Sequence, residues 1–343
     1  MFPCIEIKLD GIVHNLKILK NICNEKGISL SIVTKILVGY DALVKYIVEQ
    51  GEIDTICDSR IRNLMEFEEI DVEKWLIRSP MISEAEQVVR YSDVSLNSEL
   101  EVIQALNKAA VKLNKKHKII LMYECGDLRE GCYLTELADL LSECALMDGI
   151  EVYGIGTNLS CLNDVLPSDD NMCDFIDAVE KLENHLDMKF KVVSGGASSS
   201  IPLLFEGRLP KKINSLRMGE AVFLGNIPVY DRPFINANED NFILKAEIIE
   251  LKSKPSLPGI RPENCDNLRK RAIVAIGKQD IYLPGLSCAD SDIKVIGGSS
   301  DHVILDVTDC NGRYKVGSIV EFKMNYNCLL NAMTSKYIKK KII

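Results

Sequence analysis

The sequence has no apolar run long enough to cross a bilayer, and it has little clustered positive charge. A membrane-spanning helix needs about 20 apolar residues. Nucleic-acid binding rests on Lys and Arg contacts to phosphates, whereas this chain has a formal net charge of -9 and a single basic run at residues 339–341. We therefore expect neither a membrane nor a nucleic acid among its partners, and we expect residues 339–341 to be a solvated tail.

Disulfide and zinc patterns are also missing. The 12 Cys are scattered, with no Cys-x-x-Cys pair and no Cys/His cluster at zinc spacing, and the chain has only 4 His. Residues 1–11 hold no basic stretch followed by a long apolar run, so they predict a strand rather than a signal peptide. A cytoplasmic protein with reduced thiols and no bound metal is expected.

Apolar residues at helical spacing alternate with short runs rich in Ile and Val from residue 12 to about residue 225. The helix-like segments are 12–25, 41–50, 59–69, 83–91, 98–113, 135–147 and 171–186. The strand-like runs are 30–33, 55–57, 75–77, 94–96, 119–123, 152–155, 190–193 and 216–218. Near-continuous apolar strands between amphipathic helices favour a parallel sheet. Eight such units predict an α/β fold, a (β/α)8 TIM-type barrel, and a doubly wound open sheet is the alternative.

The pattern changes after Gly225. Residues 231–241 are polar and rich in turn formers, so they predict a linker. Strand-like runs without intervening helices then follow at 242–251, 272–277, 293–296, 303–307 and 319–324. We therefore divide the chain into a barrel domain, 1–230, and a C-terminal, mostly β domain, 231–343.

Lys35 stands where a barrel gathers its reactive groups, at the carboxyl end of the first apolar run. A lysine in this position is partly desolvated, and desolvation favours its neutral amine. A neutral amine can attack an aldehyde, which is the chemistry of a Schiff base. An ordinary surface lysine at the end of a strand is the alternative.

The segment SGGASSS, residues 194–200, follows the seventh run. Its paired glycines let the backbone approach an anion closely, and N–H groups at a helix start can hold a phosphate. The loops after strands seven and eight often build the phosphate site of such barrels, and LRMGE, residues 216–220, occupies the eighth position. A flexible loop is the alternative for the glycine-serine segment.

Taken in order, these polar segments resemble the alanine racemase family, and within it the ornithine racemase branch. The segments are VTKILVG (33–39), DSRIRNL (58–64), LNSELE (96–101), GDLREG (126–131), GIGTNLSC (154–161), SGGASSSIPLL (194–204), LRMGEAVFLG (216–225), AIGKQD (275–280) and GGSSDHVILDVTD (297–309). The resemblance covers essentially the whole chain, and the ordered set is more specific than any one motif.

The resemblance implies a barrel that binds pyridoxal 5'-phosphate, a C-terminal β domain and a head-to-tail homodimer with shared active sites. Lys35 would form the Schiff base, and Arg129 would be an active-site cation that binds substrate and assists catalysis. Asn158 would lie beside the cofactor ring. The phosphate would be held by residues that share small side chains or helix-start N–H groups, namely Ser194, Gly195, Gly196, Ser198, Ser199, Gly219, Glu220 and Ala221.

The resemblance also places Arg217 against the pyridine nitrogen. A permanent cation there disfavours protonation of the nitrogen. The ring then becomes a weaker electron sink, which favours reversible proton transfer over side reactions.

Several positions depart from the family pattern. Gly39 stands at the place of a Tyr that follows the cofactor lysine, Met122 at that of a modifiable Lys, and Asn158 at that of a His beside the ring. The family also places a catalytic Tyr ahead of the strand at 272–277, but no Tyr occurs between residues 231 and 281. Alanine is therefore not the expected substrate, and the resemblance does not identify the second base.

We expect a racemase that interconverts the L- and D-forms of a basic amino acid, ornithine above all. Lys35 can serve one face of the substrate Cα as a general base. For the opposite face we expect His302 of the partner subunit, although a structural strand histidine is an equal alternative. The side-chain ammonium of ornithine needs a carboxylate partner, for which Asp280 and Asp301 are candidates, with Ser300 positioning the substrate. Either acid could instead be an ordinary turn residue.

Three other functions stay open. A non-catalytic, pyridoxal-phosphate-binding homeostasis protein of this superfamily would be a single barrel, which the second domain disfavours. A D-amino-acid aldolase or dehydratase would bind a metal through His and Cys of the C-terminal domain. Here His302 stands almost alone among the scattered Cys265, Cys288, Cys310 and Cys328. A barrel enzyme without this cofactor is the third alternative.

Overall fold

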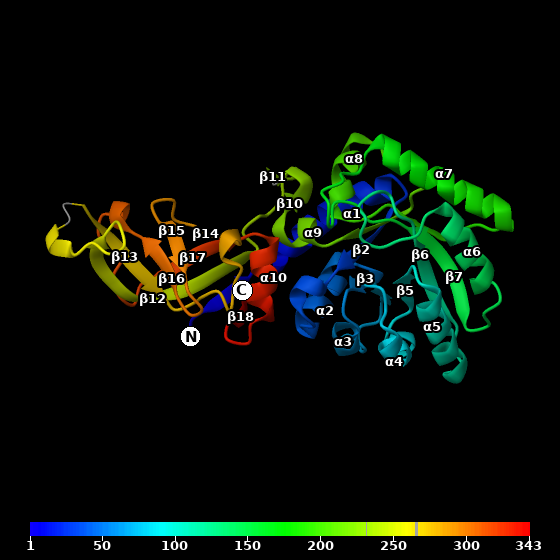
Figure 1. Cartoon of the computed structure of the whole chain (residues 1–343), viewed down its shortest axis with the longest axis horizontal. Coiled ribbons are helices and arrows are strands. Elements are labelled where there is room, and N and C mark those ends of the chain that lie inside the picture. The colour runs from blue at the N-terminus through cyan, green and yellow to red at the C-terminus, as the bar shows by residue number, and fades with distance from the viewer. Residues whose placement is uncertain (231, 265–266) are drawn as a thin grey trace. The chain divides into compact units, whose positions relative to one another are not determined.

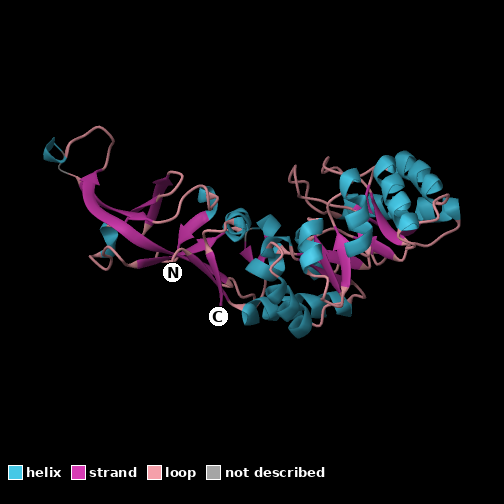
Figure 2. Cartoon of the chain, turned by 90° about the horizontal axis from the view of Figure 1, so that it is seen from below, coloured by secondary structure: helices cyan, strands magenta, loops and turns pink. Residues whose placement is uncertain are grey.

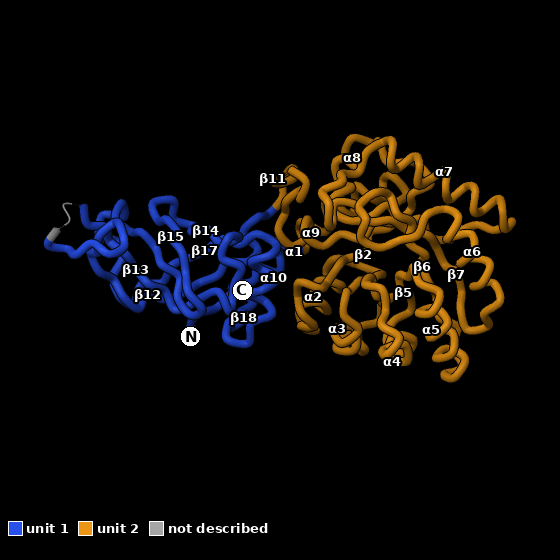
Figure 3. Tube along the Cα trace, in the orientation of Figure 1, with its two compact units in different colours: residues 1–12, 238–343 blue, residues 13–237 orange. Residues whose placement is uncertain are grey.

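The computed structural model describes residues 1–230, 232–264 and 267–343. These residues form two compact units: Val13–Ala237, and Met1–Ile12 together with Asn238–Ile343 (Figure 3). The division differs from the expected one at both ends. Residues 1–12 belong with the C-terminal sheet because their strand pairs there, and the barrel unit runs to residue 237. Asp231 and Cys265, which the sequence analysis used, lie outside the described residues.

The larger unit is a closed barrel of eight parallel strands. Its strands are β2 (Ser29–Val33), β3 (Thr55–Asp58), β4 (Glu73–Leu76), β5 (Val94–Asn97), β6 (His117–Met122), β7 (Ile150–Gly156), β8 (Val192–Ser194) and β9 (Ser215–Met218). β2 closes the barrel by pairing with β9, with Ile32 opposite Met218. Each of the eight expected runs overlaps one of these strands, so the TIM-type barrel is confirmed and the open sheet is wrong.

Helices cover the outside of the barrel strands (Figures 1 and 2). They are α1 (Leu9–Glu25), α2 (Asp41–Gly51), α3 (Ile61–Glu66), α4 (Ala85–Tyr91), α5 (Leu100–Lys112), α6 (Leu134–Cys144), α7 (Asp169–Leu186), α8 (Ile201–Glu206) and α9 (Glu220–Leu224). The sequence pattern does not indicate α8 and α9, which have six and five residues and, unlike α3, lie in no longer segment with a helical period.

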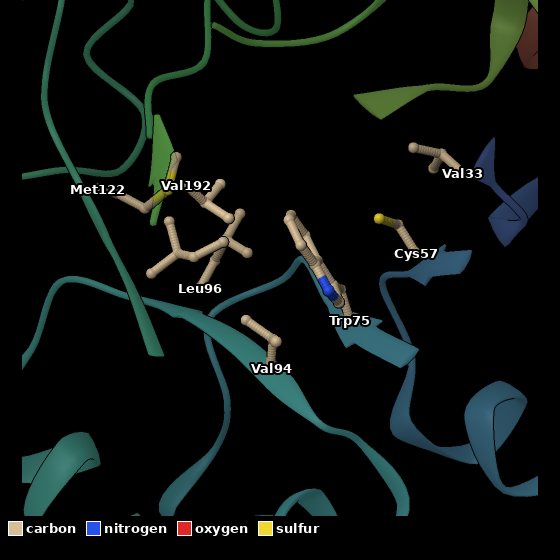
Figure 4. Close-up of a cluster of buried hydrophobic side chains, with 8 residues drawn as sticks. Val33, Cys57, Trp75, Val94, Leu96, Met122 and Val192 are labelled. Carbon is tan, nitrogen blue, oxygen red and sulfur yellow. The ribbon is translucent and has the colours of Figure 1, made fainter. Parts of the chain in front are cut away.

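The barrel interior is packed with side chains (Figure 4). A buried cluster is contributed by strands around the barrel: Val33, Cys57, Trp75, Val94, Leu96, Ile120, Met122 and Val192. Val94 and Leu96 point inward because alternate residues of a strand share one face. Burying one such aliphatic side chain contributes about 1.5–3 kcal/mol. This packed core supports the polar residues at the carboxyl ends of the strands.

The smaller unit is an eight-stranded sheet with one helix, α10 (Tyr326–Thr334). Its main path is β14-β17-β12-β13-β16-β15, all antiparallel pairs. The strands are β12 (Phe242–Pro255), β13 (Leu268–Val274), β14 (Leu286–Cys288), β15 (Lys294–Gly298), β16 (Val303–Asp306) and β17 (Ile319–Met324). The mostly β C-terminal domain is therefore confirmed.

Two strands extend this sheet from the chain ends, β1 (Cys4–Ile7) and β18 (Lys339–Ile342). β1 pairs antiparallel with β12 and parallel with β18. The strand expected within residues 1–11 therefore forms. The solvated tail expected at residues 339–341 is wrong, because these lysines lie opposite Cys4, Ile5 and Glu6 and their backbone completes the sheet.

The short strand β10 (Asn226–Ile227) precedes the linker expected at 231–241, and β11 (Arg232–Pro233), which pairs with it, lies within that linker. Among the described residues, we find no helix whose length and apolarity would let it cross a membrane.

Candidate active site

Lys35 opens a single 3-10 turn, η1 (Lys35–Leu37), directly beyond the end of β2. Ile36 and Leu37 are fully buried, which fixes the turn to the barrel. The preceding hydroxyl, on Thr34, donates to the Cys57 carbonyl at 3.1 Å and to the Asp58 carboxylate at 2.9 Å. Lys35 is thus held at the carboxyl end of the barrel, as the sequence analysis expected.

Burial lowers the pKa of the Lys35 amine below its ordinary value. The positive charge of Arg129 lowers this pKa further, whereas Cys161, Asp58 and Glu220 act in the opposite direction. Desolvation is the largest of these effects, so the Lys35 amine loses its proton more readily than an ordinary lysine does. A lysine with a lowered pKa at the carboxyl end of the barrel, called the barrel mouth below, suits the Schiff-base role that the sequence predicts for it.

Arg217 points from β9 into the barrel and is 3% exposed. Its guanidinium donates to the Ser194 hydroxyl at 3.0 Å, the Thr157 carbonyl at 2.7 Å and the Asn158 side-chain oxygen at 3.0 Å. Burial lowers the pKa of Arg217, yet a guanidinium stays protonated in proteins. The structure therefore places a fixed cation beside Asn158 and Ser194.

The two glycines after β8 stand where a larger residue would meet its neighbours closely. Gly196 has φ +100°, a conformation that side chains rarely adopt, and a Cβ there would lie 3.1 Å from the Ser200 hydroxyl. A Cβ on Gly195 would lie 2.7 Å from Ile213. A larger residue would collide with Ile213 at position 195. At position 196 it would strain the backbone and fill the space beside Ser200, which is called the cradle below.

Two helix starts meet next to these glycines. One is the 3-10 turn η3 (Ser198–Ser200), and the other is the first turn of α9, which Gly219 precedes. The Ala221 N–H donates to the Ser198 hydroxyl at 3.4 Å, which joins the two starts, and the Ser199 hydroxyl donates to the Leu159 carbonyl at 3.0 Å. Since the first N–H groups of a helix have no partner inside it, two adjoining starts suit an anion such as a phosphate monoester.

The loops after β6 and β7 are tied together by Asp127, which is 1% exposed. Its carboxylate accepts the N–H groups of Cys161 and Leu162, both at 3.1 Å, and of Asn163 at 3.2 Å. In return, the Asn163 side chain donates to the Asp127 carbonyl at 2.7 Å. The segment that carries Arg129 is therefore anchored against the segment that carries Asn158.

Glu130 joins the two arginines of the site through Asn158. Its carboxylate pairs with the Arg129 guanidinium through Nε and Nη2, and it accepts a hydrogen bond from the Asn158 amide nitrogen. The Asn158 amide oxygen accepts from Arg217. Sequence reasoning singled out the two arginines and Asn158 but missed Glu130.

The sequence analysis also missed Asp127 and the thiol of Cys161. The two acids that flank Arg129 in GDLREG were the available signal for Asp127 and Glu130. The Cys161 thiol is close enough to Lys35 and Arg129 for their charges to interact, and burial raises its pKa. The barrel mouth therefore holds more ionisable groups than the sequence analysis assigned.

The remaining site residues belong to the smaller unit. Ser299 to His302 form the turn between β15 and β16, and His302 Nδ1 lies 3.5 Å from the Ser299 hydroxyl. The Gln279 side chain donates to Asp301 at 2.6 Å, and the Gln279 N–H donates to the Ser300 carbonyl at 3.1 Å. The structure thus brings Ser300, Asp301 and His302 together with the 277–280 loop.

Asp280 lies in that loop but points away from solvent, with 6% exposure. Its carboxylate accepts the Ser335 hydroxyl at 2.6 Å. Asp301 is exposed, so it is the more accessible of the two acids assigned to the substrate ammonium. Within residues 1–230, 232–264 and 267–343, no group of three or more His, Cys, Asp or Glu side chains could hold a metal ion.

Comparison with known proteins gives consistent matches. Residues 7–227 match the family model described as alanine racemase, N-terminal domain. The chain is 42% identical to an ornithine racemase of Acetoanaerobium sticklandii, over 100% of both chains. It is 34% identical to a lysine racemase of Thermotoga maritima, over 99% of this chain and 98% of the relative. The crystal structure of an alanine racemase from Bartonella henselae with covalently bound pyridoxal phosphate has a TM-score of 0.77 at 17% identity, over 100% of both chains.

Proposed function

The chain belongs to the alanine racemase family, and we propose that it is a pyridoxal-phosphate-dependent racemase that interconverts L- and D-ornithine. The observation that carries this proposal is the full-length identity of 42% with an ornithine racemase. The lysine racemase relative, at 34% identity, supports a basic amino acid as substrate. Both relatives match the barrel and the C-terminal unit, which favours a racemase over a single-barrel cofactor carrier.

The residues at the barrel mouth fit the cofactor. Lys35 would hold its aldehyde carbon covalently, and Arg217 would face its pyridine nitrogen. The phosphate would lie at the joined helix starts, next to Gly196, where a Cβ would intrude. When bound, pyridoxal 5'-phosphate withdraws electrons from the substrate Cα and so makes the Cα proton acidic.

The side chains of the protein then move and direct that proton. The Lys35 amine, whose pKa is lowered by burial, would take it from one face of Cα or return it there. Arg217 would hold a positive charge against the ring nitrogen, which would disfavour its protonation and limit the stabilisation of the Cα charge. Arg129 lies at the barrel mouth with a partly exposed side chain, so its charge can bind the substrate carboxylate.

We further propose that the second base is His302 of a partner subunit in a head-to-tail homodimer. Asp301 and Asp280, with Ser300, would recognise the side-chain ammonium of the substrate. Support comes from the shared turn of Ser300, Asp301 and His302 and from the family resemblance. Mixing Lys35→Ala chains with His302→Asn chains should restore part of the activity, once mixed dimers are shown to form. No restoration would count against a shared site.

We also place the protein in the cytoplasm. In the part of the chain that the structure describes, the 11 cysteines are all free thiols, as is usual in a reducing compartment. Fractionation of the source cells should recover the protein with cytoplasmic markers, and recovery with an extracellular fraction would overturn this assignment.

The decisive experiment is chiral chromatography after incubation with pyridoxal 5'-phosphate. L-ornithine, L-lysine, L-arginine, L-alanine and L-serine are compared at equal concentration, with the Lys35→Ala variant as control. D-ornithine should form fastest, and Lys35→Ala should form no D-product. Covalent cofactor attachment without any D-product would favour a carrier protein, and no attachment would overturn the cofactor assignment.

A further inference from the structure

Four side chains form a continuous polar chain across the barrel mouth. Arg217, on β9, donates to the Asn158 amide oxygen at 3.0 Å. The Asn158 amide nitrogen donates to Glu130, and Glu130 accepts two further hydrogen bonds from Arg129. The order is therefore arginine, amide, carboxylate, arginine. Its buried end is Arg217, which is assigned to the pyridine nitrogen, and its partly exposed end is Arg129.

The two neighbours of Asn158 dictate the orientation of its amide. Arg217 can only donate hydrogen bonds, so it must meet the oxygen. An ionised Glu130 can only accept them, so it must meet the nitrogen. If Glu130 lost its charge, the amide nitrogen would keep a weaker acceptor or none, and the contact between Asn158 and Arg217 would lose its outer support.

Glu130 also balances the charges of the two arginines in this row of hydrogen-bonded side chains. Arg129 and Arg217 are both cations, and each disfavours the charge of the other. The Glu130 carboxylate lies between them and stabilises both, and its hydrogen bonds are the main reason that the pKa of Arg129 is raised. Without this carboxylate, the two guanidinium groups would repel each other across Asn158.

The position of Glu130 is built into the fold. Asp127, three residues earlier, binds three backbone N–H groups of the neighbouring loop. On the other side, Gly131 has φ +131°, and a Cβ there would lie 2.8 Å from the Glu124 nitrogen. Asp127 and Gly131 thus fix the backbone on both sides of Glu130. The Glu130 side chain itself is only 22% exposed.

On this geometry we propose that Glu130 is a positioning residue of the racemase, which sets the Asn158 amide against Arg217 and holds Arg129 at the barrel mouth. The proposal adds a residue to the site and rests on the proposed function. Its carboxylate makes no proton transfer to the substrate. It acts through its neighbours, so a charge-neutral replacement of the same shape is the sharpest probe.

The test compares Glu130→Gln with Glu130→Asp, and uses Glu143→Gln as the matched control. Glu143 is an exposed residue of α6, outside the site. Glu130→Gln keeps the shape but removes the charge, so kcat/KM should fall about tenfold or more, the usual effect of losing a charge-assisted hydrogen bond. Glu130→Asp should recover part of this loss. Glu143→Gln should behave as the wild type.

A second readout does not require turnover. The dissociation constant for pyridoxal 5'-phosphate and the visible absorption of the bound cofactor are recorded against pH. Glu130→Gln should shift the pH dependence of the absorption, because the charges around Arg217 change. The unfolding temperature of the cofactor-free Glu130→Gln variant should equal that of the cofactor-free Glu143→Gln variant. If Glu130→Gln destabilised the fold, its unfolding temperature would drop strongly. The kinetics and the absorption would then be measured on Glu130→Asp instead.

A double-mutant cycle separates positioning from an independent effect. If Glu130 acts partly through Asn158, Glu130→Gln should cost less in the Asn158→Ala background than in the wild type, because only its contact with Arg129 is left to lose. Additive losses, or wild-type kinetics and absorption in Glu130→Gln, would overturn the proposal. If the wild type bound the cofactor but formed no D-amino acid, the proposed function would fail, and the absorption readout would still decide the positioning role.

Discussion

The hydroxyl of Thr34 donates a 2.9 Å hydrogen bond to the carboxylate of Asp58, so the residue before Lys35 is fastened to the end of the next strand. Asp58 is fully buried and accepts two further hydrogen bonds, from the Arg60 N–H at 2.9 Å and the Asn63 side chain at 3.0 Å. The turn that presents Lys35 is thus supported by a buried carboxylate that accepts hydrogen bonds from Thr34, Arg60 and Asn63.

Replacing Thr34 by Val should loosen this turn. The variant keeps the shape of the side chain but leaves the buried Asp58 with one donor fewer, at a cost of about 1–2 kcal/mol in the free energy of unfolding. Urea denaturation of the cofactor-free protein measures this cost. Thr334→Val, at an exposed position of α10, is the control. Equal effects of the two variants would show that the Thr34 hydrogen bond is not special.

Cofactor attachment should depend on pH in a way that reflects the lowered pKa of Lys35. Only the neutral amine reacts with an aldehyde, and burial lowers the pKa of this amine. The rate of covalent attachment to the cofactor-free protein should therefore rise with pH through the lowered folded pKa and level off below the range of ordinary lysines. Stopped-flow absorbance measures the rate, and Lys35→Arg should show no attachment. A rate that kept rising into the ordinary lysine range would contradict the assignment.

The same shift has a consequence for stability. The unfolded chain binds a proton at Lys35 more tightly than the folded chain does, so the contribution of this group to stability is gained as pH rises from the folded pKa towards the unfolded one. That contribution is lost as pH falls through the folded pKa. Comparing the unfolding free energy of Lys35→Met with that of the cofactor-free wild type over this range isolates the effect.

Much of the barrel could be predicted because its physical signals are local. Buried parallel strands are apolar on both faces, so each appears as a short continuous run, and all eight overlap β2 to β9. The lysine-rich segment at 339–341 shows the limit of this reasoning. It forms β18 only because β1, from the opposite end of the chain, supplies its hydrogen-bonding partner. Pairing between distant segments leaves no trace in local hydropathy.

The site could be predicted in part for the same reason. Lys35 and Arg217 lie at strand ends, so the barrel fold alone places them at one rim. Glu130 could not be found this way. Its place depends on the left-handed backbone of Leu128, with φ 55°, and on the binding of Asp127 to residues 161–163. The sequence of this segment looks like that of an ordinary acidic loop, so it indicates neither the Leu128 conformation nor the Asp127 hydrogen bonds.

Gly196→Ala should weaken cofactor binding more than it weakens folding. At φ +100° an alanine is strained, and its Cβ would enter the cradle next to Ser200. We expect the dissociation constant for pyridoxal 5'-phosphate to rise about tenfold or more, because the backbone must shift where the phosphate is held.

Gly27→Ala is the matched control for this change. Gly27 also has a positive φ, +69°, but nothing lies within 4 Å of the point that a Cβ would occupy there. It should cost about 1 kcal/mol in the free energy of unfolding and leave cofactor affinity unchanged. Equilibrium dialysis of both variants decides the matter, and an equal loss of affinity would remove the phosphate from this cradle.

Asp127→Asn should release the loop that carries Arg129. Asparagine keeps one acceptor oxygen but turns an amino group towards the backbone N–H groups of residues 161–163, which would cost about 2–3 kcal/mol in the free energy of unfolding. Hydrogen exchange of these amides should become faster and KM should rise, because Arg129 is less well held. Asp177→Asn, on the exposed face of α7, should change neither quantity.

Arg217→Glu should change what the enzyme makes more than whether it folds around the cofactor. A carboxylate facing the pyridine nitrogen would favour its protonation, which makes the ring a stronger electron sink. A more stabilised Cα charge has more time to be protonated at the wrong carbon, which converts substrate and cofactor to a keto acid and pyridoxamine phosphate. The ratio of pyridoxamine phosphate to D-product should therefore rise several-fold.

The matched variant, Arg217→Lys, separates charge from hydrogen bonding. It keeps the cation but cannot reach Ser194, Thr157 and Asn158 with the geometry of a guanidinium. We expect slower racemisation with an unchanged product ratio, because the ring nitrogen still faces a positive charge. If both variants shifted the ratio equally, the hydrogen bonds of Arg217 would control the reaction outcome. If neither did, the cation would not face the ring nitrogen, and the barrel mouth would have to bind the cofactor in another orientation.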